Sequence, residues 1–476
     1  MRKLVLALTL LAACESFSLA QQRPLEWAAD AEGGAPYIFK DPEDPEKNIG
    51  FEVDLAAALA KEIGRPIEFK QYNWDSLVLG LQRGDFDFIM NGLEVTPDRQ
   101  EALRLSRPYY TYRLQLVVRS DEIRFWSLGD IKQLGGVVGT LGETAAARLL
   151  EDRGIEAKVY DGQAEPYQDL ALGRIDAVLL DEPIAVYYAQ PNPGLKFLGE
   201  PFAEGQYAIA FRKDQEQLAA QFDAAIEKLE QSGELRRIAQ KWERPTTDVL
   251  AETGRQLTPA KYLPLLGKAA LVTIKISVIS MALAMALGLP ISLMRLYGPR
   301  PVQWLAIAYV EFFRGIPVLL LLYILYYGLP TALGEVGVDI RPSGLTVAVM
   351  AFGLNYAAYE AEIYRAGIAA IPAGQWEAAS SLGMPRLLAF RRIILPQALR
   401  TILPPVTNDF VALFKDTSLV SVIAVVELTK QYQILSKSSL KYFEIGAATA
   451  VLYLLMSVPL GYLARRLEKR WGKAAV

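Results

Sequence analysis

Apolar and polar positions follow different patterns in the two halves of this chain. Between residues 22 and 244, strand-like stretches such as 67–71 alternate with amphipathic segments such as 50–63. This alternation is typical of an α/β sheet domain. Between residues 263 and 476, several runs contain almost no charge, and roughly twenty apolar residues suffice for a helix to cross a bilayer. The pattern predicts an α/β domain in water followed by an all-α transmembrane domain.

Five apolar runs in the second half are long enough to span a membrane. They are residues 269–293, 302–325, 345–369, 403–426 and 445–463. Basic residues gather in the loops on one side of these runs, and cytoplasmic loops of membrane proteins carry such an excess. We therefore expect the loop between the third and fourth runs, and the C-terminus, to be cytoplasmic. The first half is then expected outside.

The N-terminal segment, residues 1–20, has the layout of a secretory signal. Arg2 and Lys3 precede an apolar run that is too short to span a bilayer. Two processing routes stay open: cleavage after Ala20, or lipid attachment at Cys14, where the sequence resembles a lipoprotein box. Both routes export the following domain. Residues 245–262 lack strong periodicity, and we expect them to form a linker.

Composition removes several classes of function. The net charge of −3, with no basic stripe, gives no reason to expect nucleic-acid binding. The chain has no histidine and one cysteine, which excludes imidazole metal sites, thiolate clusters and most nucleophilic catalysis. We predict no catalytic residue, no metal site and no cofactor. A G-x-x-x-x-G-K-[ST] phosphate loop is also missing from the sequence, so any ATP hydrolysis must come from a partner.

One stretch of the first half has the chemistry of an anion site. Thr96 is placed as a helix N-cap and Pro97 as the first helical residue, so Arg99 falls in the first turn. Free backbone N–H groups there attract an anion, and a guanidinium fits a carboxylate with two hydrogen bonds. Residues 139–142, with the hydroxyl of Thr140, precede a second helix and offer a second anion site. Closure of both sites on one carboxylate would couple ligand binding to lobe closure.

Five segments of the first half carry a family resemblance. They read GFEVDLAAALAKEIG, NWDSLVLGLQRGDFDFIMNG, TPDRQEALRLSRPYY, VVGTLGETAA and ALGRIDAVLLDEP. They resemble the polar amino acid family of periplasmic substrate-binding proteins over this whole half. The resemblance implies a two-lobed α/β fold of the type II periplasmic-binding-protein class. It places the two crossings between the lobes near residues 111–116 and 201–207, and one helix over 214–242 closing the first lobe.

The resemblance also implies roles for individual residues. Asp181 matches the ligand of the substrate's α-amino group, with Asp30 as a weaker second, and Trp74 matches the aromatic residue over the ligand side chain. The segment that includes Gly92 and ends at Glu94 is part of the predicted site. Taken alone, each residue also has an ordinary structural role, for example Trp74 in the core or Asp181 in a turn.

Two departures from the family pattern bear on the substrate. Relatives usually carry Thr or Ser as a carboxylate donor where this chain has Glu94, and the usual aromatic residue near Gly33 and Gly34 is missing. An ionised Glu94 would repel a carboxylate. Three roles of Glu94 therefore stay open: it binds the ligand's α-amino group, it binds a cationic side chain of the ligand, or it points to solvent. Lysine, arginine, glutamine and other polar amino acids all stay open as ligands.

The stretch GQWEAASSLGMPRLLAFRRIILPQALRTILPP resembles the EAA loop of bacterial ABC importer permeases. We expect Glu377, Ala378 and Ala379 to start a helix whose small residues allow close approach. Gly383 then permits a turn, and Pro396 ends the second helix. The resemblance implies docking of a separate ATPase subunit. A pair of ATPases implies two permease subunits, most simply two copies of this chain, with a related permease as the alternative.

Three further segments, residues 310–317, 355–365 and 415–419, resemble permeases of the same amino acid family. They contain ionisable residues at or within predicted spans. Because a charged side chain is unfavourable inside a membrane, such residues either have a function or form structural ion pairs. These are Glu311, Arg314, Glu360, Glu362, Lys415 and Asp416.

The sequence thus predicts a binding protein fused to the permease of an ATP-driven polar amino acid importer, and not an enzyme. Two other classes of protein share part of this pattern. A ligand-gated channel would interrupt the binding domain with its pore and would have no docking loop. A periplasmic dehydratase shares the binding fold, but the permease behind the domain argues against it.

Overall fold

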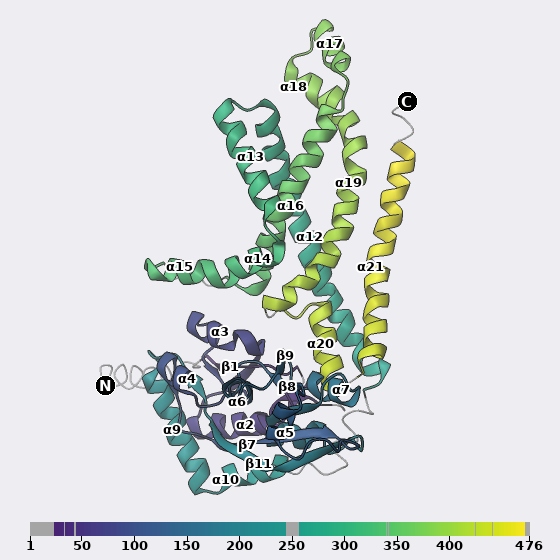
Figure 1. The fold of residues 1–476 in the computed structure, drawn as a ribbon. Helices are drawn as coiled ribbons and strands as arrows, with labels where there is room; N and C mark the ends of the chain where they lie inside the picture. Colours follow the sequence, from purple (N-terminus) through teal and green to yellow (C-terminus); the bar gives the residue numbers. More distant parts are fainter. Residues whose placement is uncertain are drawn as a thin grey trace, which may run out of the picture. The chain divides into compact units, whose positions relative to one another are not determined.

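The computed structural model describes residues 23–32, 34–41, 44–243, 257–338, 340, 342–423, 425–439 and 441–471. The predicted signal segment 1–20, with Cys14, lies outside the described residues, as do residue 244 and residues 245–256 of the predicted linker. The chain divides into two compact units, Met1–Arg255 and Gln256–Val476. Figure 1 shows the sheets and short helices of the first unit and the long helices of the second.

Two five-stranded sheets form the first unit. The first has the order β4-β1-β5-β12-β6, with β4 at Ile67–Gln71, β1 at Leu25–Ala29, β5 at Phe88–Ile89, β12 at Ala210–Phe211 and β6 at Arg104–Leu105. The second has the order β11-β7-β10-β8-β9, with β11 at Leu195–Tyr207, β7 at Tyr110–Arg119, β10 at Ala177–Asp181, β8 at Val138–Leu141 and β9 at Ala157–Tyr160. A small ribbon pairs β2, Phe39–Lys40, with β3, Asn48–Ile49.

Short helices connect these strands. They are α2 (Phe51–Ile63), α3 (Leu77–Arg83), α4 (Pro97–Ala102), α5 (Leu128–Gln133), α6 (Ala145–Asp152), α7 (Glu165–Ala171), α8 (Glu182–Tyr188), α9 (Glu216–Gln231) and α10 (Glu234–Glu243), with a 3₁₀ turn η1 at Trp74–Ser76. Parallel pairs join β1 to β4 and β5, and β8 to β9 and β10. The predicted α/β fold is therefore confirmed.

The chain passes between the two sheets twice, as predicted. It leaves the first sheet after β6 and enters the second with β7, and it returns between β11 and β12. The first crossing comes slightly before the predicted stretch because Tyr110 already pairs with Tyr207 in the antiparallel β7–β11 ladder. Two connections of this kind make the first unit two-lobed.

The single helix expected over residues 214–242 is wrong. The structure has two helices, α9 and α10, separated at Ser232 and Gly233. Gly233 has φ of +76°, a left-handed conformation that ends α9 and that glycine adopts without strain. The sequence pattern did not predict this break, because the residues on both sides of it favour helix. Both helices pack on α2, and the Trp242 indole nitrogen donates to the Asp54 carboxylate over 2.8 Å.

The core of the first lobe is built around three aromatic rings. Phe88 from β5, Phe211 from β12 and Phe222 from α9 are fully buried. Their ring centroids lie 4.7 to 5.9 Å apart. Burial of each such side chain contributes about 1.5 to 3 kcal/mol to folding. This cluster fixes α9 against the sheet whose strand ends carry part of the pocket described below.

Helices of very different lengths make up the second unit. They are α12 (Pro259–Tyr297), α13 (Arg300–Gly315), α14 (Val318–Tyr323), α15 (Leu329–Glu335), α16 (Gly344–Ala369), α17 (Ala373–Ser381), α18 (Arg386–Ala389), α19 (Leu395–Asp416), α20 (Leu428–Ser439) and α21 (Tyr442–Trp471). Irregular helical turns η2, η3 and η4 occupy Ile324–Gly328, Phe390–Ile394 and Thr417–Ile423. The last part of the predicted linker, residues 259–262, belongs to α12, because Pro259 fits a first helical turn.

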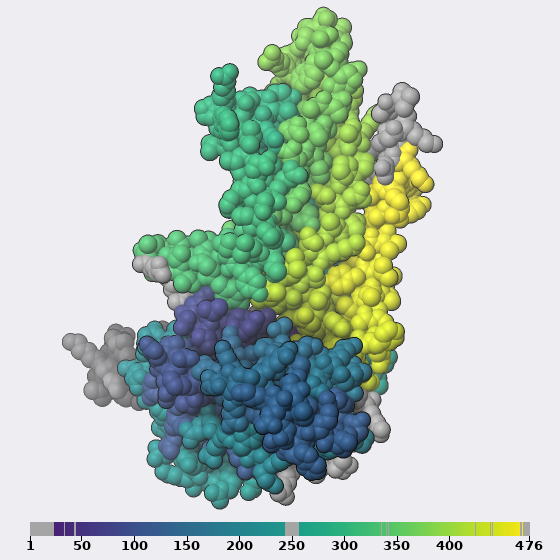
Figure 2. All heavy atoms as spheres, in the orientation of Figure 1, coloured from purple at the N-terminus to yellow at the C-terminus, as the bar shows by residue number. Residues whose placement is uncertain are grey.

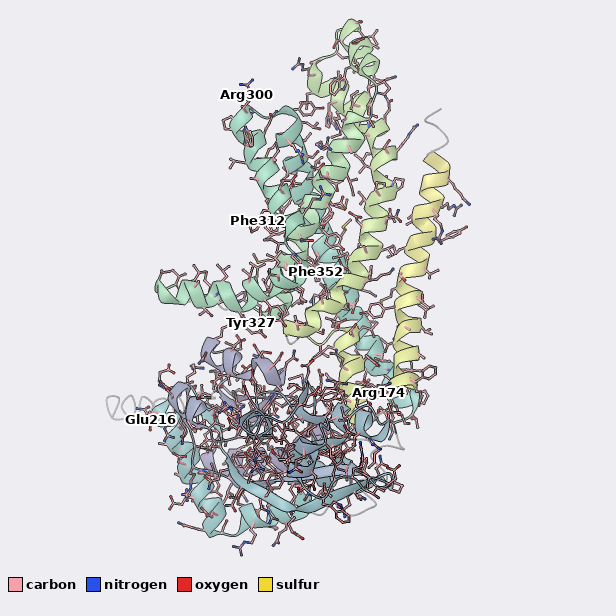
Figure 3. All side chains as sticks on the ribbon, viewed as in Figure 1. Arg174, Glu216, Arg300, Phe312, Tyr327 and Phe352 are labelled. Carbon is pink, nitrogen blue, oxygen red and sulfur yellow. The ribbon has the colours of Figure 1, made fainter. Side chains whose placement is uncertain are left out.

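Glycines let α12 and α16 run side by side (Figure 1). A Cβ on Gly288 would lie 2.8 Å from the Glu360 Cβ, and a Cβ on Gly353 would lie 2.5 Å from the Leu283 side chain. Small residues at such contacts allow the close packing that stabilises helix pairs in lipid. In Figure 3, Phe352 lies inside this packing, whereas Phe312 of α13 is 55% exposed.

Helices occupy all five predicted spans, but not all are equally apolar. Among the described residues, two helices are long and apolar enough to cross a membrane, Pro259–Tyr297 and Tyr442–Arg466. The pair Arg300–Gly315 and Val318–Gly334, bent by 101°, makes a third if it is one span. The predicted run 302–325 is therefore broken, at Ile316 and Pro317. The helices α16 and α19 fall outside this criterion, and both contain polar and charged residues.

Candidate functional site

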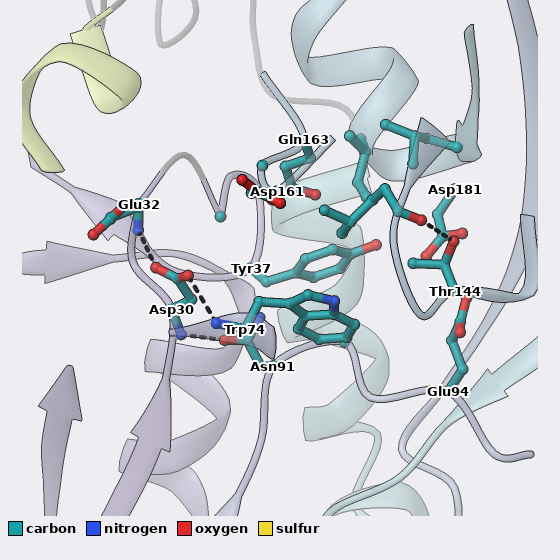
Figure 4. A pocket seen from close by; sticks show the side chains of 16 residues that line it. Asp30, Glu32, Tyr37, Trp74, Asn91, Glu94, Thr144, Asp161, Gln163 and Asp181 are labelled. Carbon is teal, nitrogen blue, oxygen red and sulfur yellow. Dashed lines mark hydrogen bonds between the residues drawn. The ribbon is translucent and has the colours of Figure 1, made fainter. Parts of the chain in front are cut away.

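A pocket lies in the first unit, at the ends of strands from both sheets (Figure 4). Its lining comes from the ends of β1, β4, β5, β8, β9 and β10 and the segments that follow them. Ligand sites in α/β sheets commonly lie at such strand ends. The described lining residues are Asp30, Glu32, Gly34, Tyr37, Trp74, Asn91, Gly92, Glu94, Leu141, Thr144, Asp161, Gly162, Gln163, Leu180, Asp181 and Ile184.

The structure brings five of the predicted site residues to this pocket: Asp30, Trp74, Gly92, Glu94 and Asp181. In Figure 4 the rings of Tyr37 and Trp74 lie between Asp30 on one side and Asp181, Thr144 and Glu94 on the other. Arg99 and Thr140 are not lining residues.

The predicted role of Thr140 is wrong. Its side chain is fully buried, and its hydroxyl donates to the Leu179 carbonyl 3.0 Å away, within the second sheet. Thr144 lines the pocket instead, as the N-cap of α6, where its Oγ1 accepts from the Ala147 N–H at 3.2 Å. A threonine directly before a run of alanines is an N-cap signal that the sequence does contain.

Asp30 holds one wall of the pocket through hydrogen bonds. Its carboxylate accepts from the Glu32 N–H at 2.9 Å, the Gln71 side-chain amide at 2.9 Å and the Trp74 N–H at 3.0 Å. These hydrogen bonds satisfy the carboxylate oxygens and fix the turn that presents Trp74. The Trp74 indole nitrogen in turn donates to the Gly142 carbonyl, 3.0 Å away in the other lobe. Asp30 therefore positions Trp74.

Arg99 and the start of α6 form the predicted anion site. The predicted local structure is confirmed: α4 begins at Pro97, and the Thr96 side chain accepts from the Arg99 N–H. The Arg99 guanidinium donates to the Glu94 carbonyl at 3.1 Å, to the Glu94 carboxylate at 3.5 Å and to the Glu143 carbonyl at 2.9 Å. It also lies 5.6 Å from the centroid of the Trp74 ring.

The anion in this site is Glu94. The Ala145 N–H, at the first turn of α6, donates to both carboxylate oxygens of Glu94, at 3.0 and 2.8 Å. With 2% exposure, the Glu94 side chain does not point to solvent, which removes one of the three alternatives. Both predicted carboxylate partners, Arg99 and the second helix, thus hold a carboxylate that belongs to the protein.

Glu94 and Asp181 are two of the three buried acids that line the pocket, and Glu32 is the third. Burial raises the pKa of Glu94, whereas Arg99 and the Ala145 N–H lower it. Burial also raises the pKa of Asp181 well above its usual value, the charge of Glu94 raises it further, and the hydrogen bond from Tyr207 opposes this. A cation between Glu94 and Asp181 would stabilise their charged forms.

Tyr37 is a pocket residue that the sequence prediction missed. Its hydroxyl lies 2.7 Å from the Tyr207 hydroxyl, and Tyr207 donates to the Asp181 carboxylate. Tyr37 supplies an aromatic ring three residues after Gly34, close to the position where the family's usual aromatic residue is missing. It lies in a turn, where no periodic pattern marks a pocket residue. Asn91, Asp161 and Gln163 were missed for the same reason, since they lie in loops.

Glu52 supports the pocket from behind. It is fully buried on α2 and accepts hydrogen bonds from the Gly92 N–H and the Tyr109 hydroxyl. Gly92 has φ of +58°, so this bond fixes a left-handed turn in the pocket wall. Burial raises the pKa of Glu52 to about 7, against both hydrogen bonds. Within the described residues, no group of three or more acidic or cysteine side chains is placed to hold a metal ion.

The predicted docking stretch of the second unit is a helical hairpin, α17 and α18, seen at the end of that unit in Figure 2. Gly383, with φ of +72°, makes the turn between them, as predicted. Glu377, Ala378 and Ala379 lie in the middle of α17, so the prediction that they start the helix is wrong. The helix begins earlier because Pro372 precedes it as N-cap.

Pro396 does not end the second helix of the hairpin. It lies in the first turn of α19, where a missing N–H is tolerated, and η3 joins α18 to α19. Ala379 is fully buried, while Glu377 and Ala378 are exposed. A groove runs beside the hairpin and is lined by Leu293, Tyr297, Trp376, Glu377, Ser380, Ser381, Arg386, Leu387 and Phe390.

Some of the ionisable residues in the helices are paired. Glu362 forms ion pairs with Arg295 and, at 2.9 Å, with Arg365. The Tyr356 hydroxyl donates to the Asp416 carboxylate at 2.7 Å. These contacts give Glu362 and Asp416 structural partners that join α12 to α16 and α16 to α19.

Two family models match the chain. Residues 28–245 match bacterial extracellular solute-binding proteins, family 3, and residues 278–473 match the binding-protein-dependent transport system inner membrane component. The probable glutamine ABC transporter permease protein GlnM of Bacillus subtilis is 38% identical over 42% of this chain and 91% of its own length. The glutamine transport system permease protein GlnP of Escherichia coli K12 is 38% identical over 44% and 93%.

The first unit is also similar to a solved structure. An ancestral arginine-binding protein bound to glutamine is 32% identical, covers 46% of this chain and 98% of its own, and has a TM-score of 0.43.

The fold, the pocket and the helical hairpin define a solute-binding domain fused to a membrane permease. The chain belongs to the family of binding-protein-dependent transport system inner membrane components. It is a subunit of an amino acid importer of the ABC class, a transporter subunit and not an enzyme, and it resides in the inner membrane. This family implies an ATPase partner and an amino acid ligand.

Proposed function

We propose that this subunit captures a cationic amino acid in the pocket between its two lobes and passes it through its own membrane unit. The observation that carries this proposal is the charge of the pocket. Its described lining contains five acidic residues and no lysine or arginine. The five are Asp30, Glu32, Glu94, Asp161 and Asp181. Relatives are named for glutamine, but its neutral amide side chain would supply no positive charge beyond the α-ammonium group to this acidic lining.

Asp181 receives an ammonium group of the ligand in this proposal. It ends β10 and is 7% exposed, and its described hydrogen-bond partner is the Tyr207 hydroxyl. A buried carboxylate is costly unless a positive charge accompanies it. The rings of Trp74 and Tyr37 line the space between the acids, where the ligand's apolar chain would pack.

The topology in this proposal follows the charge of the loops. Residues 1–20 act as the export signal, residues 22–244 lie outside, and residues 263–476 span the membrane. The linker 245–262 keeps the binding domain at high local concentration near its permease. The hairpin α17–α18 lies in the cytoplasm and docks the ATPase through Glu377 and its neighbours.

Two copies of this chain form the transport unit in this proposal. The helix α13 exposes three large apolar side chains, Trp304 at 71%, Leu305 at 67% and Phe312 at 55%. A second copy would cover such a stripe, as would lipid. Native mass spectrometry of the complex from its own membranes distinguishes two copies of this chain from one copy beside a different permease.

The test of the ligand proposal is calorimetric titration of the full chain in lipid nanodiscs with the twenty amino acids. We expect L-lysine or L-arginine to bind, and the Asp181→Asn variant to bind neither tightly. Tight binding of glutamine alone, unchanged in Asp181→Asn, contradicts the proposal.

A further inference from the structure

The anion site of this pocket contains a carboxylate of the protein itself. Glu94 accepts from the Ala145 N–H at the start of α6 and from the Arg99 guanidinium. These are the two groups that the sequence predicted for the carboxylate of an amino acid ligand. The remaining contacts of the guanidinium in the described structure go to the carbonyls of Glu94 and Glu143.

The backbone around Glu94 is fixed on both sides. Glu94 forms a β-bridge with Tyr207, the Val95 N–H donates to the Gln206 carbonyl at 2.8 Å, and the Ala208 N–H donates to the Leu93 carbonyl at 2.9 Å. These bonds join the segment to the return crossing between the lobes. The Glu94 side chain therefore leaves the anion site only by rotating into a pocket that already holds Asp181.

No cationic side chain belongs to the described lining of the pocket, which contains no arginine or lysine. The nearby Arg148 forms an ion pair with Asp98 at 2.9 Å. A ligand carboxylate in this pocket would face Glu94 and Asp181 without a cation to balance it, which is unfavourable at low dielectric. A ligand with only positive groups would meet two buried acids and no repulsion.

We propose that Glu94 replaces the ligand carboxylate in the anion site, and that the pocket therefore also takes organic cations that have no carboxylate, namely alkyl diamines and guanidino amines. This inference rests on the proposed function, because it assumes that the pocket is the ligand site. It makes Glu94 the residue that sets specificity: the pocket recognises the cationic end of its ligands, and an α-carboxylate gains nothing there.

The probes are two matched pairs that differ only by a carboxylate, L-arginine with agmatine and L-lysine with cadaverine. Each is titrated calorimetrically into the full chain in nanodiscs, as wild type and as Glu94→Thr. We expect the wild type to bind the amines at least as tightly as the amino acids. Glu94→Thr empties the anion site, and the preference then shifts toward the amino acids by about tenfold or more, the equivalent of one good charged hydrogen bond.

The controls separate folding and charge from specificity. Glu68→Thr changes an exposed acid on the edge strand β4. It should leave the ratio of the two affinities, amine to amino acid, unchanged in both pairs. Glu94→Gln keeps the size of the side chain but removes its charge, and it replaces Glu94→Thr if that variant does not fold. We then expect a smaller shift in the same direction, because the amide still occupies the site but no longer neutralises Arg99.

Three results overturn the inference. If the wild type binds the amino acids about tenfold more tightly than the amines, Glu94 does not replace the ligand carboxylate, and the proposed function stands. If the variants leave the ratio unchanged, Glu94 does not set specificity. If none of the four probes binds, the proposed function fails as well.

Discussion

The indole nitrogen of Trp74 donates a hydrogen bond to the carbonyl oxygen of Gly142, 3.0 Å away. Trp74 follows β4 in the first lobe, and Gly142 follows β8 in the second. Beside this bond, Glu94 reaches from the first-lobe side to the N–H of Ala145. Both contacts join the two lobes at the pocket, so groups that we propose to bind the ligand also connect the lobes.

Trp74→Phe removes the bond to Gly142 but keeps an aromatic ring in the pocket. A neutral hydrogen bond contributes about 1 kcal/mol, so we expect ligand affinity to fall about fivefold. Calorimetry on the full chain measures this. Trp126→Phe is the matched control, because Trp126 is 79% exposed. Equal affinity in both variants would show that the bond does not favour the ligand-bound form.

Asp181→Asn removes the acid assigned to the ligand's ammonium group. A hydrogen bond to a charged group contributes about 1.5 to 3 kcal/mol, so affinity for a cationic ligand should fall about tenfold to a hundredfold. Asp152→Asn, at the exposed end of α6, should leave affinity unchanged. An unchanged affinity in Asp181→Asn would remove this residue from the site.

Glu52 should make the binding domain less stable as pH rises. Its pKa is raised from 4.5 to about 7 by burial, so the folded state binds more protons than the unfolded state between these values. The free energy of unfolding therefore falls through this window, by up to about 3 kcal/mol, and is level above it. The full loss is present above pH 7.

The measurement is thermal unfolding of the full chain at pH 5 and pH 8. In Glu52→Gln we expect a smaller drop in melting temperature between the two pH values, because an amide does not titrate. Glu68→Gln, at an exposed residue of β4, should keep the wild-type drop. The same drop in Glu52→Gln would contradict a buried, protonating Glu52.

Ala379→Leu should separate ATPase docking from ligand binding. Ala379 is fully buried in α17, and extra methylenes at such a position typically destabilise packing by about 1 to 3 kcal/mol. We expect loss of co-purification with the ATPase and unchanged affinity for the ligand. Ala373→Leu, at the exposed first residue of α17, should retain the ATPase. Retention by both variants would place docking elsewhere.

Periodicity predicted the two architectures well, because strand and helix patterns depend on local sequence. The cap at Thr96 and the turn at Gly383 were also predictable, since each needs a particular residue at one position. The break at Gly233 was not predicted, because the residues on both sides form helices equally well. The predicted helix start at Glu377 and helix end at Pro396 were wrong for a similar reason.

The pocket itself could be predicted only in part. Five predicted residues line it, because they follow strands whose ends meet. Thr140 and Thr144 each lie two residues from Gly142, and only the sheet register shows that the first faces Leu179. The contact of Glu94 with Ala145 joins residues 51 positions apart, so no local pattern encodes it. Tyr37 was missed because a turn shifts it away from the position where an aromatic residue was sought.

The most direct test of the account is uptake of labelled L-lysine and L-arginine by proteoliposomes that contain the complex purified from its native membranes. We expect ATP-dependent accumulation of at least one of them with the wild-type chain, and none with Asp181→Asn at the same protein level. Flux that needs no ATP would indicate a ligand-gated channel and contradict the account, as would ATP-dependent uptake that Asp181→Asn leaves unchanged.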